Sequence, residues 1–317
     1  MKIHLPNSAF LGNIDPFLRG FDPSSPNTLE ITANENWLSI HPFVLSMTAA
    51  LGLTIDPKQI TFAKPSAKSA HYLVRMGLFK MLNVPCDISI QEHASEGRFI
   101  PLTQIHTSEE LSKFITEMIP LLHNEPEQAK TIGHIISELV RNVIEHSEST
   151  DGAILCAQYY KKTNRIGIGI ADTGIGLKAT INHSHKADTD LEAIKLALWP
   201  GITGTTRRPG GTGQNAGAGL FIIKAIADVN QDFFVIYSGQ GFYKLRKKHT
   251  PKLSLKANPF EDRHTKDGGL PCWKGTVVGV DITLDQTREF SVLLSAIRKA
   301  YSELKKKNGH RSKPRFL

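Results

Sequence analysis

The sequence predicts an α/β protein, in the form of an α+β two-layer sandwich. In the first third of the chain, apolar runs of strand length alternate with longer runs of helical periodicity, and a larger set of helices and strands follows. The 317 residues exceed one typical domain, which favours two. Hydrophobic residues make up 40% and charged residues 21%, ordinary values for a globular chain, and no window reaches the roughly 20 apolar residues of a membrane span.

The first block is expected to be a small α/β domain over residues 1–105. Residues 28–33 and 59–63 have the pattern of short strands, and each is followed by an apolar run of helical length, at 40–51 and 69–82. This block is expected to finish near residue 88. A polar connector then leads to a boundary near residue 105.

Residues 106–285 are expected to form the second domain, and residues 286–317 a C-terminal helix with a basic tail. Helical patterns are followed by two strands with Thr163 and Asn164 at the turn between them, and the helix near 190 is ended by Pro200-Gly201. The helices are expected at 109–124, 126–147, 190–201 and 220–230, and the strands at 151–162, 165–172, 232–239, 241–248 and 275–284.

Cysteine content and the N-terminus indicate the compartment. The chain has three scattered cysteines and no CxxC pair, which argues against a disulfide framework or a zinc site and favours a reducing cytoplasm. The first residues lack the apolar core and cleavage site of a signal peptide. We therefore expect a cytoplasmic protein without membrane association.

The net charge of +8 is unevenly distributed. Six positive charges lie in the C-terminal tail, on Lys305, Lys306, Lys307, Arg311, Lys313 and Arg315. Such a tail suits contact with nucleic acid or an acidic partner, but it also has the composition of a solvated chain end. Both interpretations stay open.

Three motifs carry candidate chemistry. Glu138, Asn142 and His146 stand four residues apart beside an apolar helical stripe and so form one polar row. Asp172 ends an apolar strand and is followed by Gly174 and Gly176, where a carboxylate can accept a hydrogen bond and glycines let a flat ligand approach. Each motif alone is also compatible with a solvated helix edge or an ordinary turn.

The third motif is the stretch 210–220, GGTGQNAGAGL, which has five glycines in eleven positions. A helix is expected to begin near Leu220, and its unpaired N–H groups and positive dipole end favour phosphate binding, with Gly213, Gly217 and Gly219 clearing space. The stretch fits neither the P-loop nor the dinucleotide fingerprint. A flexible linker is the alternative.

In this order, the segments SELVRNVIEH, ADTGIGL and GGTGQNAGAGL resemble the motifs of the GHKL superfamily, the Bergerat ATP-binding fold of gyrase, heat-shock chaperones, histidine kinases and mismatch-repair ATPases. The segment KGTVVGVDITL matches the closing strand of that fold, with Thr276 as its threonine. The resemblance covers roughly residues 125–285 and implies a mixed sheet and the cofactors ATP and Mg²⁺.

The resemblance also implies roles for individual residues. Asn142 matches the Mg²⁺ ligand, Glu138 the catalytic base, and Asp172 the adenine-recognising carboxylate. Glu138, where two-component histidine kinases usually have asparagine, makes the chain most similar to the anti-sigma-type serine kinases. The further cofactor-binding positions are His146, Gly174, Gly176, Gly213, Gly217, Gly219, Leu220 and Thr276, and residues 178–212 with Arg207 and Arg208 match the ATP lid.

The first block resembles the STAS-like domains of anti-anti-sigma proteins. It departs from them where they carry a phosphorylatable serine at a helix start, because His41-Pro42 occupies that position and Ser39 comes about two residues early.

Together these resemblances imply a regulatory, Mg²⁺-dependent ATP-binding protein that hydrolyses ATP or transfers its γ-phosphate. The alternative is a nucleotide-gated interaction switch with little or no turnover. The expected partners are regulatory proteins, with a homodimer and nucleic-acid contact through the basic tail as further options.

Overall fold

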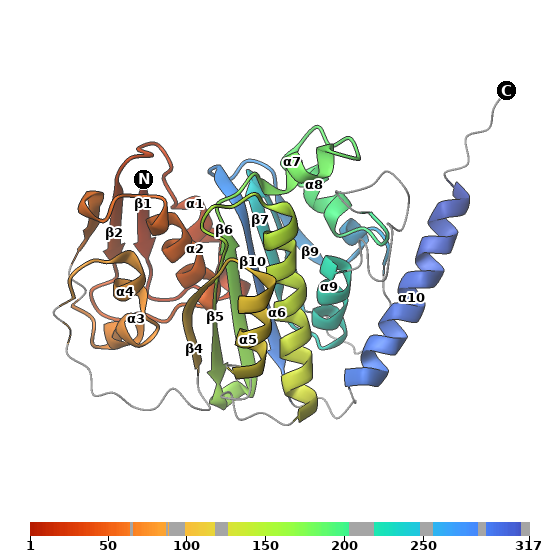
Figure 1. Ribbon diagram of the computed structural model, residues 1–317, viewed down its shortest axis with the longest axis horizontal. Helices are drawn as coiled ribbons and strands as arrows, with labels where there is room; N and C mark the ends of the chain where they lie inside the picture. Colours follow the sequence, from red (N-terminus) through yellow and green to blue (C-terminus); the bar gives the residue numbers. More distant parts are fainter. Residues whose placement is uncertain are drawn as a thin grey trace.

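Two β-sheets organise the part of the chain that the computed structural model describes, which is residues 1–63, 66–86, 88, 99–117, 126–202, 219–247, 256–284 and 290–311 (Figure 1). One sheet has three strands in the order β1-β2-β3, and the other has seven in the order β4-β5-β6-β10-β7-β8-β9. The α/β class predicted from the sequence is therefore confirmed.

The seven strands of the larger sheet pair only in antiparallel fashion, so the expected mixed sheet is wrong. Neighbours β5 and β6, and β7 and β8, are joined by short turns, a connection that forces antiparallel pairing. The strands are β4 (Phe99–Ile105), β5 (Ala153–Tyr160), β6 (Arg165–Asp172), β7 (Phe234–Gly239), β8 (Gly241–Leu245), β9 (His264–Asp267) and β10 (Trp273–Thr283).

Helices cover one face of this sheet (Figure 1). The long helix α6 buries the predicted stripe of isoleucines and valines, in one core with α9 and residues of β6 and β10. The helices of this layer are α5 (Ser108–Glu117), α6 (Pro126–His146), α9 (Gly219–Val229) and α10 (Phe290–Arg311). Two shorter helices, α7 (Gly176–Asn182) and α8 (Asp190–Ala197), follow β6.

The first block contains the smaller sheet, whose strands β1 (Lys2–Leu5), β2 (Leu29–Ala33) and β3 (Ile60–Phe62) are parallel. The single helix expected at 69–82 is wrong, because Gly77 adopts a left-handed φ of 79° and interrupts it. Its helices are α1 (Asp15–Arg19), α2 (Pro42–Leu53), α3 (His71–Arg75) and α4 (Leu78–Leu82).

Helix α2 lies directly on the face of the larger sheet that α6 and α9 leave free. In the IGIGIA segment of β6 the isoleucines face α6, and the small residues face α2. An ideal Cβ on Gly169 would lie 2.3 Å from the backbone nitrogen of Phe43, so glycine is required for this approach. Ser46 Oγ donates to the carbonyl of Gly169 at 2.8 Å.

Gly169→Ala is therefore expected to destabilise the chain by about 1–3 kcal/mol, because α2 must move away from β6. The control is Gly133→Ala in α6, where a Cβ would meet its nearest atom at an ordinary 3.6 Å. Denaturant melts of the two variants check this. Equal midpoints would contradict the close approach of α2.

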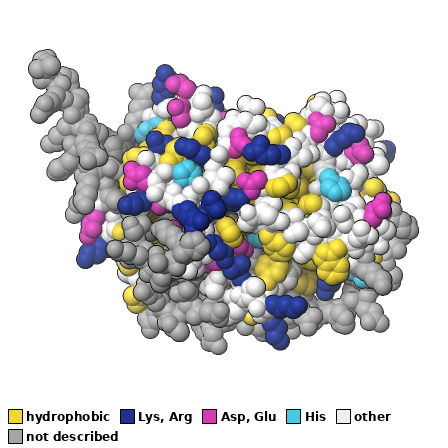
Figure 2. Space-filling model, turned by 180° about the vertical axis from the view of Figure 1, so that it is seen from behind, with side chains coloured by type: hydrophobic (Ala, Val, Ile, Leu, Met, Phe, Trp, Pro, Cys, Tyr) yellow, Lys and Arg dark blue, Asp and Glu magenta, His cyan; other side chains and the backbone are white. Residues whose placement is uncertain are grey.

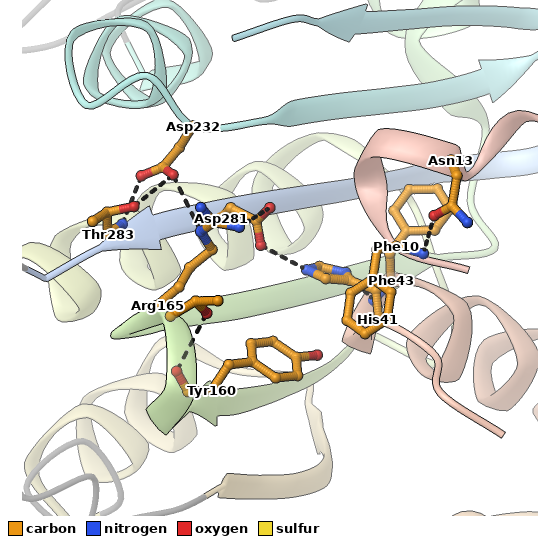
Figure 3. Close-up of polar contacts among 10 residues, drawn as sticks. Phe10, Asn13, His41, Phe43, Tyr160, Arg165, Asp232, Asp281 and Thr283 are labelled. Carbon is orange, nitrogen blue, oxygen red and sulfur yellow. Dashed lines mark hydrogen bonds and ion pairs between the residues drawn. The ribbon is translucent and has the colours of Figure 1, made fainter. Parts of the chain in front are cut away.

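A buried polar chain also joins α2 to the sheet (Figure 3). His41, the N-cap of α2, accepts a hydrogen bond from the Phe43 N–H through Nδ1 at 3.0 Å, so its Nε2 carries the proton when the ring is neutral. That Nε2 lies 3.4 Å from Asp281 on β10. Arg165 continues the chain, 3.9 Å from Asp281 and 3.4 Å from Asp232.

The first block thus adds a third layer to the sandwich, beyond the two that the sequence predicted. One apolar core contains Phe43 and Val44 of α2 together with Cys156, Ala171 and Val277 of the larger sheet. The expected boundary near residue 105 falls at the end of β4, a strand that pairs with β5.

On the face seen in Figure 2, basic and acidic side chains both occur, with hydrophobic side chains between them. The large hydrophobic side chains exposed in the described part of the chain are Trp37 and Val292. Among the same residues, no helix combines the length and apolar character needed to cross a membrane.

Candidate functional site

Helix α6 carries the first group of candidate residues. Glu138, Asn142 and His146 follow one another by one helical turn each, and all three side chains are half-buried. The structure therefore confirms that these residues form a row at the edge of the buried stripe.

Glu138 faces the start of α9. An ideal Cβ on Gly219 would lie 2.6 Å from Glu138 Oε2, so the carboxylate lies directly against the backbone of the first turn of α9. Burial raises the pKa of Glu138, while the positive charges of Arg141 and Arg298 oppose that shift. The carboxylate of Glu138 thus lies at the N-terminal end of α9, an eleven-residue helix whose first N–H groups have no partner within the helix.

Asn142 lies one turn further along α6. Its Nδ2 is buried and has no hydrogen-bond partner within the described residues. Mg²⁺ prefers oxygen ligands and is commonly held by one or two protein groups plus phosphates and waters, so the amide oxygen of Asn142, one helical turn from Glu138, is a ligand of the kind that such an ion takes. The described residues contain no group of three or more His, Cys, Asp or Glu side chains that could hold a metal.

Asp172 is at the end of β6, and its side chain is on the α6 side of the sheet, as are those of Ile168 and Ile170. It is 3% exposed. The carboxylate accepts hydrogen bonds from the Gly174 N–H, at 2.9 Å, and from the Thr276 N–H. Burial raises the pKa of Asp172 to about 7 against the effect of both bonds, so this carboxyl group changes its charge near neutral pH.

Thr276 is opposite Asp172 in the β6–β10 ladder. Its hydroxyl lies 3.3 Å from Ser238 Oγ, which also accepts from the Leu177 N–H at 2.9 Å. Gly176 has a φ of 76°, a conformation that suits glycine. The carboxylate, the threonine and the glycine turn therefore form one hydrogen-bonded unit.

The turn after Asp172 packs against the C-terminal end of α6. The Ile175 N–H donates to the carbonyl of Ser147 at 2.7 Å, and Thr180 Oγ1 donates to the carbonyl of His146 at 3.2 Å. A Cβ on Gly174 would lie 1.9 Å from the Ser147 carbonyl oxygen. Gly174 is thus required by a protein contact, whereas the approach of a ligand was the role expected from the sequence.

One helix therefore connects the two groups. Glu138 lies beside the start of α9, and the Asp172 turn contacts Ser147, nine residues later, or about 13 Å along α6.

The segment between the Asp172 turn and the glycine cluster is attached to the sheet in its first part. Asp190 Oδ2 accepts from the Gln240 N–H at 2.9 Å, and a Cβ on Gly241 would meet the backbone of α8 within 2.9 Å. The described residues of the expected lid, 178–202, thus include α8 packed against the β7–β8 turn.

Several expected site residues lie outside the described residues, namely Arg207, Arg208, Gly213 and Gly217. Gly219 and Leu220 are described and begin α9. Three residues that the sequence did not predict contact the Asp172 unit, namely Ser147, Ser238 and Trp273. The only signal for Trp273 was its place just before the Gly-Thr of β10.

Neither a protein-family model nor a curated protein matches this chain.

Proposed function

We propose that this chain is a Mg²⁺-dependent ATP-binding protein of the GHKL superfamily, which hydrolyses ATP or transfers its γ-phosphate as part of a regulatory module. The observation that supports this most directly is the joint position of Glu138 at the first turn of α9 and of the Asp172 turn at the far end of α6. A carboxylate for the base and an amide for the metal then occur along α6, and helix N–H groups for phosphate lie beside the carboxylate at the start of α9.

In this proposal the adenine end of the nucleotide lies at Asp172. The carboxylate accepts a hydrogen bond from the amino group of adenine, and the Gly174 and Thr276 N–H groups hold it in place. Because these two N–H groups hold the carboxylate at the end of β6, its position is set before the nucleotide binds.

The phosphate end lies at the start of α9, where backbone N–H groups and the positive end of the helix dipole attract anions. Asn142 would hold Mg²⁺ through its amide oxygen. The ion, when bound, neutralises phosphate charge in the transition state. The cationic side chains of Arg141 and Arg298, close enough to Glu138 to oppose the rise of its pKa, add positive charge at this end.

Glu138 acts as the general base. Its carboxylate accepts a proton from water, or from a substrate hydroxyl, while that oxygen forms a bond to the γ-phosphorus. The bond between the γ-phosphorus and the bridging oxygen breaks, and ADP leaves with the electron pair. Burial, which raises the pKa of Glu138, makes the carboxylate a stronger base.

A nucleotide-gated switch is the second candidate, and the contact of α2 with β6 favours it. The strand that ends in Asp172 is also the strand on which α2 rests. A change at the nucleotide would therefore reach the first block through a single strand.

Calorimetric titration of the chain with ATP tests the proposal. We expect binding that weakens when Mg²⁺ is removed, and a loss of this Mg²⁺ dependence in Asn142→Ala, because the amide oxygen is then missing. Glu109→Gln is the control, since Glu109 is exposed in the first turn of α5. Failure of the wild-type chain to bind ATP in the presence of Mg²⁺ would refute the proposed function.

A further inference from the structure

We propose that Trp273 is a positioning residue for nucleotide recognition, and that it links the first block to the carboxylate of Asp172. This inference rests on the proposed function, because it concerns the adenine end of the same site.

Trp273 is the first residue of β10 and is 2% exposed. Its indole Nε1–H donates to the backbone carbonyl of Asp172 at 3.1 Å. The β6–β10 ladder ends at the pair of Asp172 and Thr276, so the indole satisfies a buried carbonyl just where the backbone ladder stops.

A bulge separates Trp273 from Thr276. Trp273 is paired with Gly239 and Thr276 with Ser238, so Lys274 and Gly275 are extra residues in β10. Gly275 has a φ of 108°, and a Cβ there would lie 2.2 Å from the Asp172 carbonyl oxygen. Trp273 and Thr276, at the two ends of the bulge, therefore bond to the same residue, one to its backbone and one to its carboxylate.

The other edge of Trp273 faces the first block. The centroid of its ring lies 6.0 Å from the centroid of the Phe21 ring, and both rings belong to the core that contains α2. The next residue, Asp22, exchanges two backbone hydrogen bonds with Lys2 of β1. A displacement of β1 would therefore be transmitted through Phe21 to the indole, and from the indole to the backbone of Asp172.

The three tryptophans of the chain allow a matched experiment. Trp273→Phe keeps an aromatic ring but removes the N–H donor, and Trp37→Phe changes a side chain that is 57% exposed. We expect Trp273→Phe to weaken ATP and ADP binding equally, by about five- to tenfold, because one hydrogen bond at the adenine end is lost. Trp37→Phe is expected to leave both affinities unchanged.

A second readout separates positioning from loss of stability. When the bulge loosens, the Thr276 N–H bond to the carboxylate weakens, and the ionised form of Asp172 loses a stabilising contact. The acidic midpoint of nucleotide affinity is then expected to move to higher pH in Trp273→Phe. If this variant does not fold, Phe21→Leu replaces it. Phe21→Leu is expected to weaken ATP and ADP binding equally, by a smaller factor than Trp273→Phe.

Unchanged affinities and an unchanged midpoint in a folded Trp273→Phe, or in Phe21→Leu where it replaces that variant, would overturn the inference while leaving the proposed function intact. A wild-type chain that binds neither ATP nor ADP would instead overturn the proposed function, and with it the role given to Trp273.

Discussion

Replacing Asp172 with alanine is expected to weaken ATP binding by about 10- to 150-fold, the effect of losing a hydrogen bond to a charged group. The carboxylate is the one acceptor that we assign to the amino group of adenine, and alanine has none. Calorimetric titration of ATP and ADP measures the loss. Both nucleotides are expected to be affected alike, because they share the adenine.

The matched control is Asp232→Ala. Asp232 is equally buried, and burial raises its pKa too, but it binds Thr283 at the opposite end of β10, about 23 Å from Thr276. Both variants lose a buried carboxylate, so both are expected to lose stability. Only Asp172→Ala is expected to lose affinity for ATP. Full ATP affinity in Asp172→Ala would remove the adenine role of this residue.

The pH dependence of binding follows from the same carboxyl group. The pKa of Asp172 is about 7, so below neutral pH the carboxyl group is mostly protonated. Binding through the ionised carboxylate then requires the release of a proton. Affinity is therefore expected to be constant above pH 7 and to fall by up to about tenfold per pH unit below it. Asp172→Asn cannot ionise, so its remaining affinity is expected to lack this acidic limb.

The pH dependence of folding stability has the opposite sign to that of ATP affinity. Because the pKa in the folded chain lies above the ordinary value of 3.8, the folded state holds a proton that the unfolded state releases. The contribution of Asp172 to stability is present below about pH 4 and is lost as the pH rises through about 7. Nucleotide binding and stability of the unliganded chain are thus expected to change in opposite directions over this range.

Glu138→Gln is expected to leave ATP bound but to lower turnover by about 10²- to 10⁴-fold, the usual contribution of a general base. Glutamine has nearly the same size as glutamate, so it fits in the same place beside Gly219. The space there is narrow, because a Cβ on Gly219 would collide with the Glu138 side chain. Phosphate release and ATP affinity are measured on the same preparation. Glu109→Gln, an exposed residue in the first turn of α5, is expected to behave as the wild type.

The outcome also decides between the two candidate functions. Turnover in the wild type that survives Glu138→Gln would contradict the role of the base and favour the nucleotide-gated switch. Phosphate transfer to a protein hydroxyl, lost in Glu138→Gln, would identify a serine or threonine kinase.

The local patterns of the sequence predicted most elements because their causes are local. The isoleucine stripe of α6 and the left-handed Asn164 at the β5–β6 turn follow from helical periodicity and turn preference. The break at Gly77 was missed, because the apolar pattern continues through it. Strands β1, β4 and β9 were missed as well, since they are short or lie at sheet edges.

The sequence by itself determined the α/β class, the row of Glu138, Asn142 and His146, and the carboxylate at the end of β6, since helical and strand periodicity put these residues in place. Only the tertiary structure decided that the glycines of β6 serve the approach of α2 and that Trp273 holds the backbone of Asp172. Such contacts join residues more than 100 positions apart, and no spacing along the chain encodes which strand a helix lies on or which carbonyl an indole finds.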